Sequence, residues 1–190
     1  MLIGLISDTH IPEAGPELWP QAYDRLRGVD MILHGGDIHV LEVIDQLEEI
    51  APIYVARGNG DDGSAGRPLV PDDPRLKEAL GLEIEGFRVG LTHDIALPEW
   101  PPHRTIHTVM DHYFGGPQHI IVHGDTHVAS VETLRGVLLV NPGSPMFPRN
   151  LNTRLGTMGF LELENGRAHA WLEQLDEDGS HVIAEQPRYV

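Results

Sequence analysis

Side chains that bind divalent metal ions follow five short apolar runs of this chain, each at the point where the run ends. Two of the runs are followed by Asp8-Thr9-His10 and Gly124-Asp125-Thr126-His127, and a third by Gly35-Gly36-Asp37. Gly58-Asn59 and Thr92-His93 follow the other two. Carboxylate, amide and imidazole ligands without sulfur suit Mn, Fe, Zn and similar ions. If the runs are buried strands whose ends converge, these side chains form one metal cluster.

Hydrolysis of a phosphate ester is the chemistry that such a cluster would suit. Two metal ions about 3.5–4 Å apart lower the pKa of a bridging water and bind the ester oxygens. Holding two cations so close requires a bridging carboxylate, and Asp37 is the candidate. Arg57 and Arg149 are the best-placed cations for binding the phosphate, and Arg57 directly precedes Gly58-Asn59. Each motif alone is typical of an ordinary turn, and only their common order indicates a metal site.

The elements that would position these side chains alternate between strand and helix in the first half of the chain. Apolar runs predict strands at Leu2–Ser7, Met31–His34 and Ile53–Ala56. Helices are expected over Pro16–Arg27, which has a proline near its start, and over Val40–Glu49. Strand-helix-strand units of this length imply a parallel sheet with right-handed crossovers.

The second half is rich in strands. Glu85-Gly86 predicts one hairpin and Asn165-Gly166 another. A helix is expected over Arg104–Phe114, where apolar residues recur at helical spacing. Strands are expected at Glu83–Ile84, Phe87–Leu91, His119–Val122, Ser130–Leu134, Val137–Val140, Phe160–Leu163 and Ala168–Leu172. The whole pattern predicts an α/β fold in which two sheets pack together with helices outside.

One long segment, Asp61–Leu80, is rich in Gly, Pro and Asp and shows no convincing period. Loops of this length in compact domains are often functional. Because the segment leaves directly from Asn59, we expect it to line the substrate side of the site.

The composition bounds the class of protein. A chain of 190 residues without a linker or repeat is expected to form one domain spanning 1–190. The net charge of −16 argues against gripping long nucleic acid, and the acidic tail Glu173–Asp178 is expected to be solvated. No cysteine is present, which excludes disulfides and thiolate metal sites. No apolar run is long enough for a membrane span, so we expect a soluble cytoplasmic enzyme without a membrane partner.

The order and chemistry of the motifs resemble the calcineurin-like metallophosphoesterases, and among them the small prokaryotic phosphodiesterases. The segment Asn141–Arg149, which reads NPGSPMFPR, also looks like that branch. The resemblance spans Leu2 to Leu163. It implies a four-layer αββα sandwich of two mixed β-sheets flanked by helices. It also implies two divalent metal ions as cofactors, with manganese ahead of Fe, Zn, Ni or Mg.

The resemblance further implies which side chains hold the metals. One metal would be held by Asp8, His10, Asp37 and His127. The other would be held by Asp37, Asn59, His93 and the residue at position 125. The family usually has Gly-His-x-His where this chain has Gly124–His127. Three readings remain open: Asp125 ligates through oxygen, which we favour; His123 takes its place; or the second site is weak and the protein binds one metal.

Two departures from the family pattern bear on the substrate. Gly60 stands where many members carry a histidine that can protonate the leaving group. General acid catalysis is worth about 10²–10⁴-fold, so activated aryl diesters are expected to react and poor leaving groups to react slowly. An aspartate at position 125 cancels the formal charge of two divalent ions and one hydroxide, together with Asp8 and Asp37. Dianionic phosphate is therefore expected to bind weakly, which favours diesters.

The sequence thus predicts a metal-dependent phosphodiesterase that hydrolyses small phosphodiesters, such as cyclic or activated nucleotides, with a metal-bridging hydroxide. Asp37, Asn59 and Arg57 are the expected catalytic residues. There are three alternatives. Two are enzymes: a phosphomonoesterase, and a hydrolase of amides or other esters. The third is a non-catalytic protein-interaction scaffold, like a retromer subunit of the same family. A homo-oligomer is left open.

Most other histidines are expected to lie outside the site. His103, His107 and Asp111 recur every four residues, but opposite an apolar stripe, which indicates a solvated helix face. His34 is expected to be a hydrogen-bonded residue of the core. His39 gives no usable signal.

Overall fold

Seven strands form the first of two sheets in the computed structural model, which describes residues 1–95, 97–149 and 152–189. The strand order is β12-β11-β10-β1-β2-β3-β4. Four strands are parallel: β1 (Leu2–Ile6), β2 (Met31–His34), β3 (Ile53–Ala56) and β4 (Leu76–Lys77). Three antiparallel strands extend from β1: β10 (Thr157–Glu164), β11 (Arg167–Asp176) and β12 (Gly179–Tyr189).

The second sheet has five strands in the order β5-β6-β7-β9-β8. Its strands are β5 (Ala79–Ile84), β6 (Phe87–Thr92), β7 (Ile120–Val122), β8 (Ser130–Leu134) and β9 (Val137–Asn141). β6, β7 and β9 are parallel to one another, and β5 and β8 pair with them as antiparallel hairpins. Both sheets are therefore mixed, as predicted.

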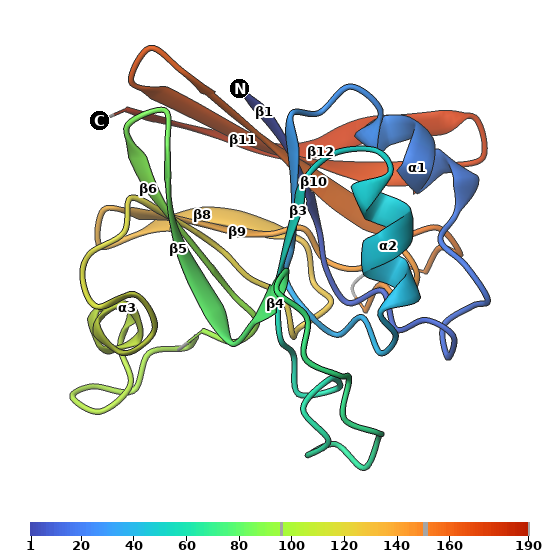
Figure 1. Ribbon diagram of the computed structural model, residues 1–190. Coiled ribbons are helices and arrows are strands. Elements are labelled where there is room, and N and C mark those ends of the chain that lie inside the picture. Colours follow the sequence, from blue (N-terminus) through green and yellow to red (C-terminus); the bar gives the residue numbers. More distant parts are fainter. Residues whose placement is uncertain (96, 150–151, 190) are drawn as a thin grey trace.

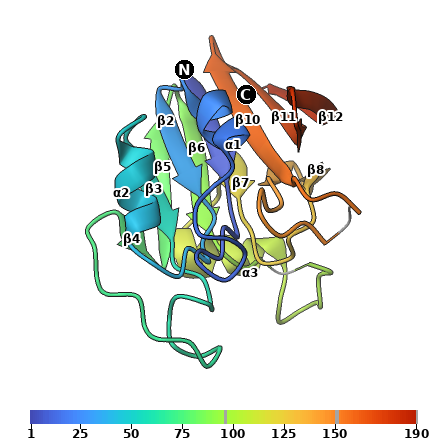
Figure 2. The same cartoon turned by 90° about the vertical axis from the view of Figure 1, so that its right-hand side faces the viewer.

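Helices cover the outer face of each sheet (Figures 1 and 2). α1 (Pro20–Leu26) and α2 (Glu42–Glu48) pack on the first sheet, and α3 (Ile106–Phe114) packs on the second. Alternation along β2 shows the layering, because Ile32 joins the core under α1 and α2 whereas Leu33 joins the core between the sheets. The four-layer αββα sandwich is confirmed.

The helix α3 shows why the sequence pattern succeeds. The Thr105 hydroxyl accepts the Thr108 N–H and the Thr108 hydroxyl accepts the Thr105 N–H, and left-handed Gly115 ends the helix. The apolar side, which includes Met110, is buried, and His103, His107 and Asp111 are exposed as expected. The helix begins two residues later than predicted, at Ile106.

Several boundaries differ from the prediction. α1 begins at Pro20, four residues later than expected, because this proline occupies the first turn. The expected loop Asp61–Leu80 is interrupted by β4 and by the start of β5. No helix among the described residues is long and apolar enough to cross a membrane.

The expectation of a solvated tail at Glu173–Asp178 holds for Glu177 and Asp178, which are exposed, and is wrong for Glu173. β11 continues to Asp176, and β12 pairs along it. Glu173 is buried and accepts hydrogen bonds from Arg25 Nε and Nη2, each at 2.7 Å. The arginine of α1 supplies the positive charge that lets this carboxylate leave solvent.

Candidate metal centre

The predicted ligands come together at one end of the sandwich, where strands of both sheets end. β1, β2 and β3 of the first sheet lead into Asp8, Asp37 and Asn59. β6 and β7 of the second sheet lead into His93 and the segment that ends at His127. Because parallel strands end at the same edge, two facing sheets place five loop starts around one point. The segments after β3 and before α3 project from this end (Figures 1 and 2).

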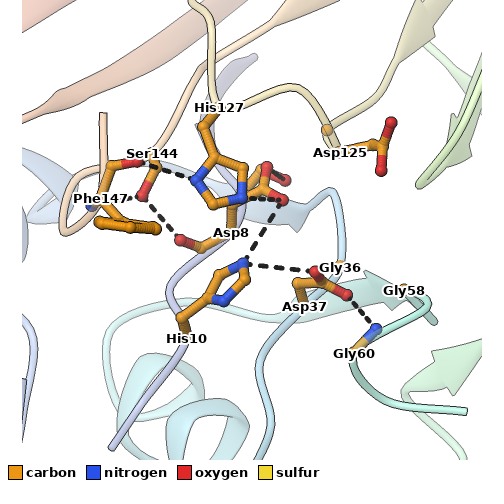
Figure 3. A network of polar contacts seen from close by, with 12 residues as sticks. Asp8, His10, Gly36, Asp37, Gly58, Gly60, Asp125, His127, Ser144 and Phe147 are labelled. Atoms are coloured by element: carbon orange, nitrogen blue, oxygen red, sulfur yellow. Dashed lines mark hydrogen bonds and ion pairs between the residues drawn. The ribbon is translucent and has the colours of Figure 1, made fainter. Parts of the chain in front are cut away.

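Asp8, His10 and His127 form the first group of facing ligand atoms. His127 Nε2 lies 3.5 Å from Asp8 Oδ1, and His10 Nε2 lies 3.9 Å from the same oxygen (Figure 3). Asp8 is fully buried, and its other oxygen, Oδ2, accepts a hydrogen bond of 2.6 Å from the Ser7 hydroxyl. One oxygen of the carboxylate is thus fixed by the protein, and the other faces the two imidazoles.

Asp37 lies between this group and His93. Its Oδ2 is 3.3 Å from His10 Nε2, and its Oδ1 is 3.5 Å from His93 Nε2. The Gly60 N–H donates to Oδ1 at 2.7 Å and fixes the carboxylate plane. A carboxylate with one oxygen toward each group of ligands has the placement required of a metal bridge.

The donor set fits divalent cations. Asp8 Oδ1 and His10 Nε2 are buried, and neither has a hydrogen-bond partner among the described residues. His93 Nδ1 donates to the Gly35 carbonyl at 2.7 Å, and His127 Nδ1 donates to the Phe147 carbonyl at 2.8 Å. Because a carbonyl only accepts, both imidazoles present an unprotonated Nε2 to the site when neutral, as metal-binding histidines do.

The second side of the site is more open. Asn59 Oδ1 is 3.1 Å from His93 Nε2, and Asp125 Oδ1 is 3.8 Å from it. The Asp125 side chain is 46% exposed and stands apart from the three-residue groups (Figure 3). His123 is buried, belongs to none of those groups, and lies with Nδ1 3.4 Å from Asn141 Nδ2. Of the two candidates, the structure brings Asp125 to the site, and its ligand role stays a prediction.

The carboxylates dominate the electrostatics of the cluster. Burial alone would lower the pKa of His10, but Asp37 and Asp8 raise it to about 9. Burial likewise opposes the charge on His93, yet the two carboxylates raise the pKa of that imidazole. His10 in turn holds the pKa of Asp37 below its ordinary range despite burial. The carboxylates therefore favour a positive charge at this place, which a metal cation would supply.

The backbone at the ligands is left-handed. Asp8, Asp37 and His127 have φ of 54°, 57° and 59°, and Asp125 has 69°. Such conformations in non-glycine residues are costly and cluster at functional sites. Their presence at four of the predicted ligands supports a functional role for this end of the sandwich.

Asp61 is a supporting residue that was not predicted from the sequence. Its buried carboxylate accepts the N–H groups of Asp37 and Gly58, each at 2.9 Å, and of His39 at 2.8 Å. It therefore ties the loop after β2 to the loop after β3. Burial raises the pKa of Asp61 above its ordinary value. An acid directly after Gly58-Asn59-Gly60 is the signal that could have indicated this role.

The segment that begins at Asn141 has a similar supporting role. Asn141 Nδ2 donates to the Gly124 carbonyl at 2.8 Å, and the Ser144 hydroxyl donates to the Asp8 carbonyl at 2.7 Å. The segment after β9 thus fixes the two loops that carry Asp8 and His127. The Asn-Pro-Gly-Ser turn therefore supplies the side chains that hold these two loops in position.

A cavity of about 740 Å³ adjoins the second side of the site. Arg57 lines it, but this guanidinium donates to the carbonyls of Asp61 and Val70 and pairs with Asp72 at 3.2 Å. Those contacts hold the long loop, and a phosphate-binding role for Arg57 stays a prediction. Arg104 also lines the cavity and was not singled out in the sequence.

Two other histidines lie next to the cluster. His34 behaves as expected, since its Nδ1 accepts the Gly36 N–H at 3.0 Å and its Nε2 is 3.2 Å from the Thr9 hydroxyl. Complete burial lowers the pKa of His34 to about 3. His39, which gave no signal in the sequence, joins His10 and Asp37 in a further group of potential ligands.

Comparison with known proteins agrees with the fold and the cluster. The chain is 36% identical over 149 residues, 78% of this chain and 80% of the relative, to a probable metallophosphoesterase of Methanothermobacter thermautotrophicus. It is 23% identical over 171 residues, 86% of this chain and 94% of the relative, to a Methanocaldococcus jannaschii protein named as a phosphodiesterase. Vacuolar protein sorting 29 from Cryptosporidium parvum shares the fold with a TM-score of 0.78 at 22% identity, over 100% of this chain and 98% of that one. Residues 1–166 match the calcineurin-like phosphoesterase superfamily domain, and the chain belongs to that superfamily.

Proposed function

We propose that this metallophosphoesterase is a phosphodiesterase that hydrolyses small phosphodiesters at a dinuclear metal centre. The observation that carries the proposal is the position of Asp37, with one carboxylate oxygen toward His10 and the other toward His93. The buried Asp8 Oδ1, unpartnered within the described part of the chain, supports a cation on the first side.

The chain's own groups would divide the work as follows. Asp8, His10 and His127 would hold one metal and Asn59, His93 and Asp125 the other, with Asp37 shared. Two divalent ions held in this place would lower the pKa of a bound water and offset charge on the ester oxygens. The carbonyls that accept from His93 and His127 keep both rings oriented, and the Ser7 hydroxyl keeps Asp8 in place.

The charge of the cavity supports diesters over monoesters. Its lining includes the carboxylates of Asp62, Glu78, Asp94 and Asp125. Both arginines of the lining are already paired, Arg57 with Asp72 and Arg104 with Asp94. A monoester is mostly a dianion at neutral pH, whereas a diester carries one negative charge. The acidic wall therefore repels a monoester more strongly.

The experiment compares bis(p-nitrophenyl) phosphate with p-nitrophenyl phosphate as substrates of the Mn²⁺-loaded protein. We expect a higher kcat/KM for the diester, and loss of both activities in Asp37→Asn. The matched control Asp111→Asn changes an exposed aspartate on α3 and should retain wild-type rates. Faster turnover of the monoester would contradict the diester preference and identify a phosphomonoesterase.

A protein-interaction scaffold is the second candidate, favoured by one observation. The structures with TM-scores of 0.71–0.78 include vacuolar protein sorting 29 of Cryptosporidium parvum and Entamoeba histolytica. The same assay separates the two functions. A chain that binds two metals and turns over neither ester would support the scaffold.

A further inference from the structure

His39, two residues after Asp37, lies beside the metal cluster. Its side chain is only 3% exposed, although the neighbouring Glu13 side chain is 48% exposed. The ring centroid is 4.3 Å from that of His10. Nε2 is buried, and the residues that the structure describes offer it no hydrogen-bond partner. A buried imidazole nitrogen without a partner is costly unless it binds something.

The opposite ring nitrogen is firmly held. His39 Nδ1 lies 2.6 Å from Glu13 Oε2, so Nδ1 carries the hydrogen that this carboxylate accepts. His93 and His127 are arranged in the same way, with Nδ1 donating to an acceptor and Nε2 left for the site. A carboxylate that orients a histidine is a common partner of metal ligands. The hydrogen bonding of His39 is thus that of a metal ligand rather than that of a core residue.

The place toward which Nε2 points is the metal cluster. One ligand atom from each of His10, Asp37 and His39 lies within 4.8 Å of the others. A Cβ atom built on Gly60 would lie 2.6 Å from His39 Nε2 and 2.8 Å from Asp37 Oδ1. The missing side chain at position 60 therefore leaves the space into which His39 reaches. The position of the His39 ring therefore requires a glycine at position 60.

We propose that His39 is an additional imidazole ligand of the metal held by Asp8, His10 and Asp37, and that Glu13 positions it. The inference rests on the dinuclear centre proposed above and adds a donor to it. A third imidazole beside His10 and His127 shifts the preference of that site from Mg²⁺ toward Co²⁺, Ni²⁺ and Zn²⁺. Glu13 acts only through His39, so it is a positioning residue.

The test measures Co²⁺ binding to the full chain by visible absorption and by competition with a chelator. His39→Ala should weaken one of the two Co²⁺ sites by more than about 10–100-fold and change the Co²⁺ absorption bands. Glu13→Gln keeps the ring and removes the charge of its partner, and it should weaken the same site by about 10–100-fold. Glu13 is exposed, so this variant retains the fold even if His39→Ala does not.

Two control variants match these changes. His169 pairs with Glu185 at 2.9 Å on the surface of β11, so His169→Ala removes a histidine–carboxylate pair away from the site. Arg67 Nε lies 3.4 Å from Glu13 Oε1, so Arg67→Ala removes the other ion pair of Glu13 and leaves His39 untouched. Both should keep the wild-type affinities and spectrum.

The outcomes separate this inference from the proposed function. Two Co²⁺ ions in wild type, with unchanged affinities and spectrum in Glu13→Gln and a folded His39→Ala, would overturn the role of His39 and leave the dinuclear centre standing. A wild-type chain that binds no Co²⁺, Mn²⁺ or Zn²⁺ would overturn both. A selective loss at one site in both variants supports the inference.

Discussion

At the scale of single residues, the site depends on close contacts that leave no room for a methyl group. A Cβ atom on Gly124 would lie 2.0 Å from Ser7 Oγ and 2.7 Å from Asp8 Oδ2. Ser7 is the donor that fixes Asp8, so this glycine protects a ligand through its neighbour. Gly58 leaves space for Asp37 directly, because Asp37 Oδ1 would lie 2.0 Å from a Cβ atom added to this glycine.

Gly124→Ala should therefore weaken metal binding without removing a ligand. The added methyl group must displace the Ser7 hydroxyl, and loss of such a supporting contact costs about 10–100-fold in metal affinity. Isothermal titration with Mn²⁺ measures the change. Gly116→Ala is the matched control, because a Cβ there meets no atom within 4 Å. Equal affinities in the two variants would contradict the role given to Ser7 and Asp8.

Asp125 sets the charge of the proposed second metal site. Replacing it by histidine removes one negative charge next to His93, from which it lies 3.8 Å. Asp125→His should therefore bind inorganic phosphate more tightly, measured as a lower inhibition constant against diester hydrolysis. Asp62→His, in the same cavity wall, is the control for a general charge effect. An inhibition constant that stays the same in Asp125→His would remove the charge argument for diesters.

At the scale of elements, Glu173 joins α1, β11 and β12. Its carboxylate accepts from Arg25 of α1, from Trp171 Nε1 at 2.9 Å and from the Ser180 hydroxyl at 2.5 Å. Burial would raise the pKa of Glu173, but the contacts with Arg25, Ser180 and Trp171 bring it below its ordinary value. The charged form is thus favoured in the folded protein.

Glu173→Gln should lower the free energy of unfolding by about 1–3 kcal/mol at pH 7, because charged hydrogen bonds are lost from a buried group. A folded-state pKa below the unfolded value contributes stability above the unfolded pKa and loses it as the pH falls through the folded pKa. The difference from wild type should therefore shrink in urea unfolding below about pH 4. Glu185→Gln, at an exposed pair, should change stability by no more than about 0.5 kcal/mol. If the difference in free energy of unfolding between wild type and Glu173→Gln increased at low pH, the proposed dependence of stability on the ionised Glu173 would be contradicted.

The strands and the ligands at their ends show which parts of the fold and of the site could be predicted from the sequence. Short apolar runs bounded by turn residues located β1, β2 and β3 to within a residue, because burial on both faces leaves a continuous signal. β12 escaped detection because its alternation carries polar and exposed residues. The ligands at strand ends were found by their order along the chain. Asp61 and His39 stand close to predicted ligands in the sequence, but only the folded backbone brings their side-chain atoms to Asp37.

At the scale of the whole molecule, the metal cluster lies where the two sheets meet, at the end of the apolar core between them. The first sheet supplies Asp8, His10, Asp37 and Asn59, and the second supplies His93, Asp125 and His127. In a chain of net charge −16, the buried carboxylates at this junction repel one another without a cation. Bound metal would therefore stabilise the packing of the sheets.

Metal binding should raise the melting temperature of the protein. A ligand at 100 times its Kd stabilises the folded state by about 2.7 kcal/mol, which for a chain of this size shifts Tm by about 5–10 °C. Differential scanning calorimetry with Mn²⁺ and with a chelator measures the shift. Asp37→Asn should show a much smaller one. Identical melting temperatures in Mn²⁺ and chelator would contradict a site that links the sheets.

Anomalous diffraction from a Mn²⁺-loaded crystal would show whether Asp37 bridges two metal ions. We expect two anomalous peaks about 3.5–4 Å apart, both in contact with the Asp37 carboxylate. One peak should lie toward His10 and His127 and the other toward His93. A single peak, or peaks that do not touch Asp37, would contradict the dinuclear centre.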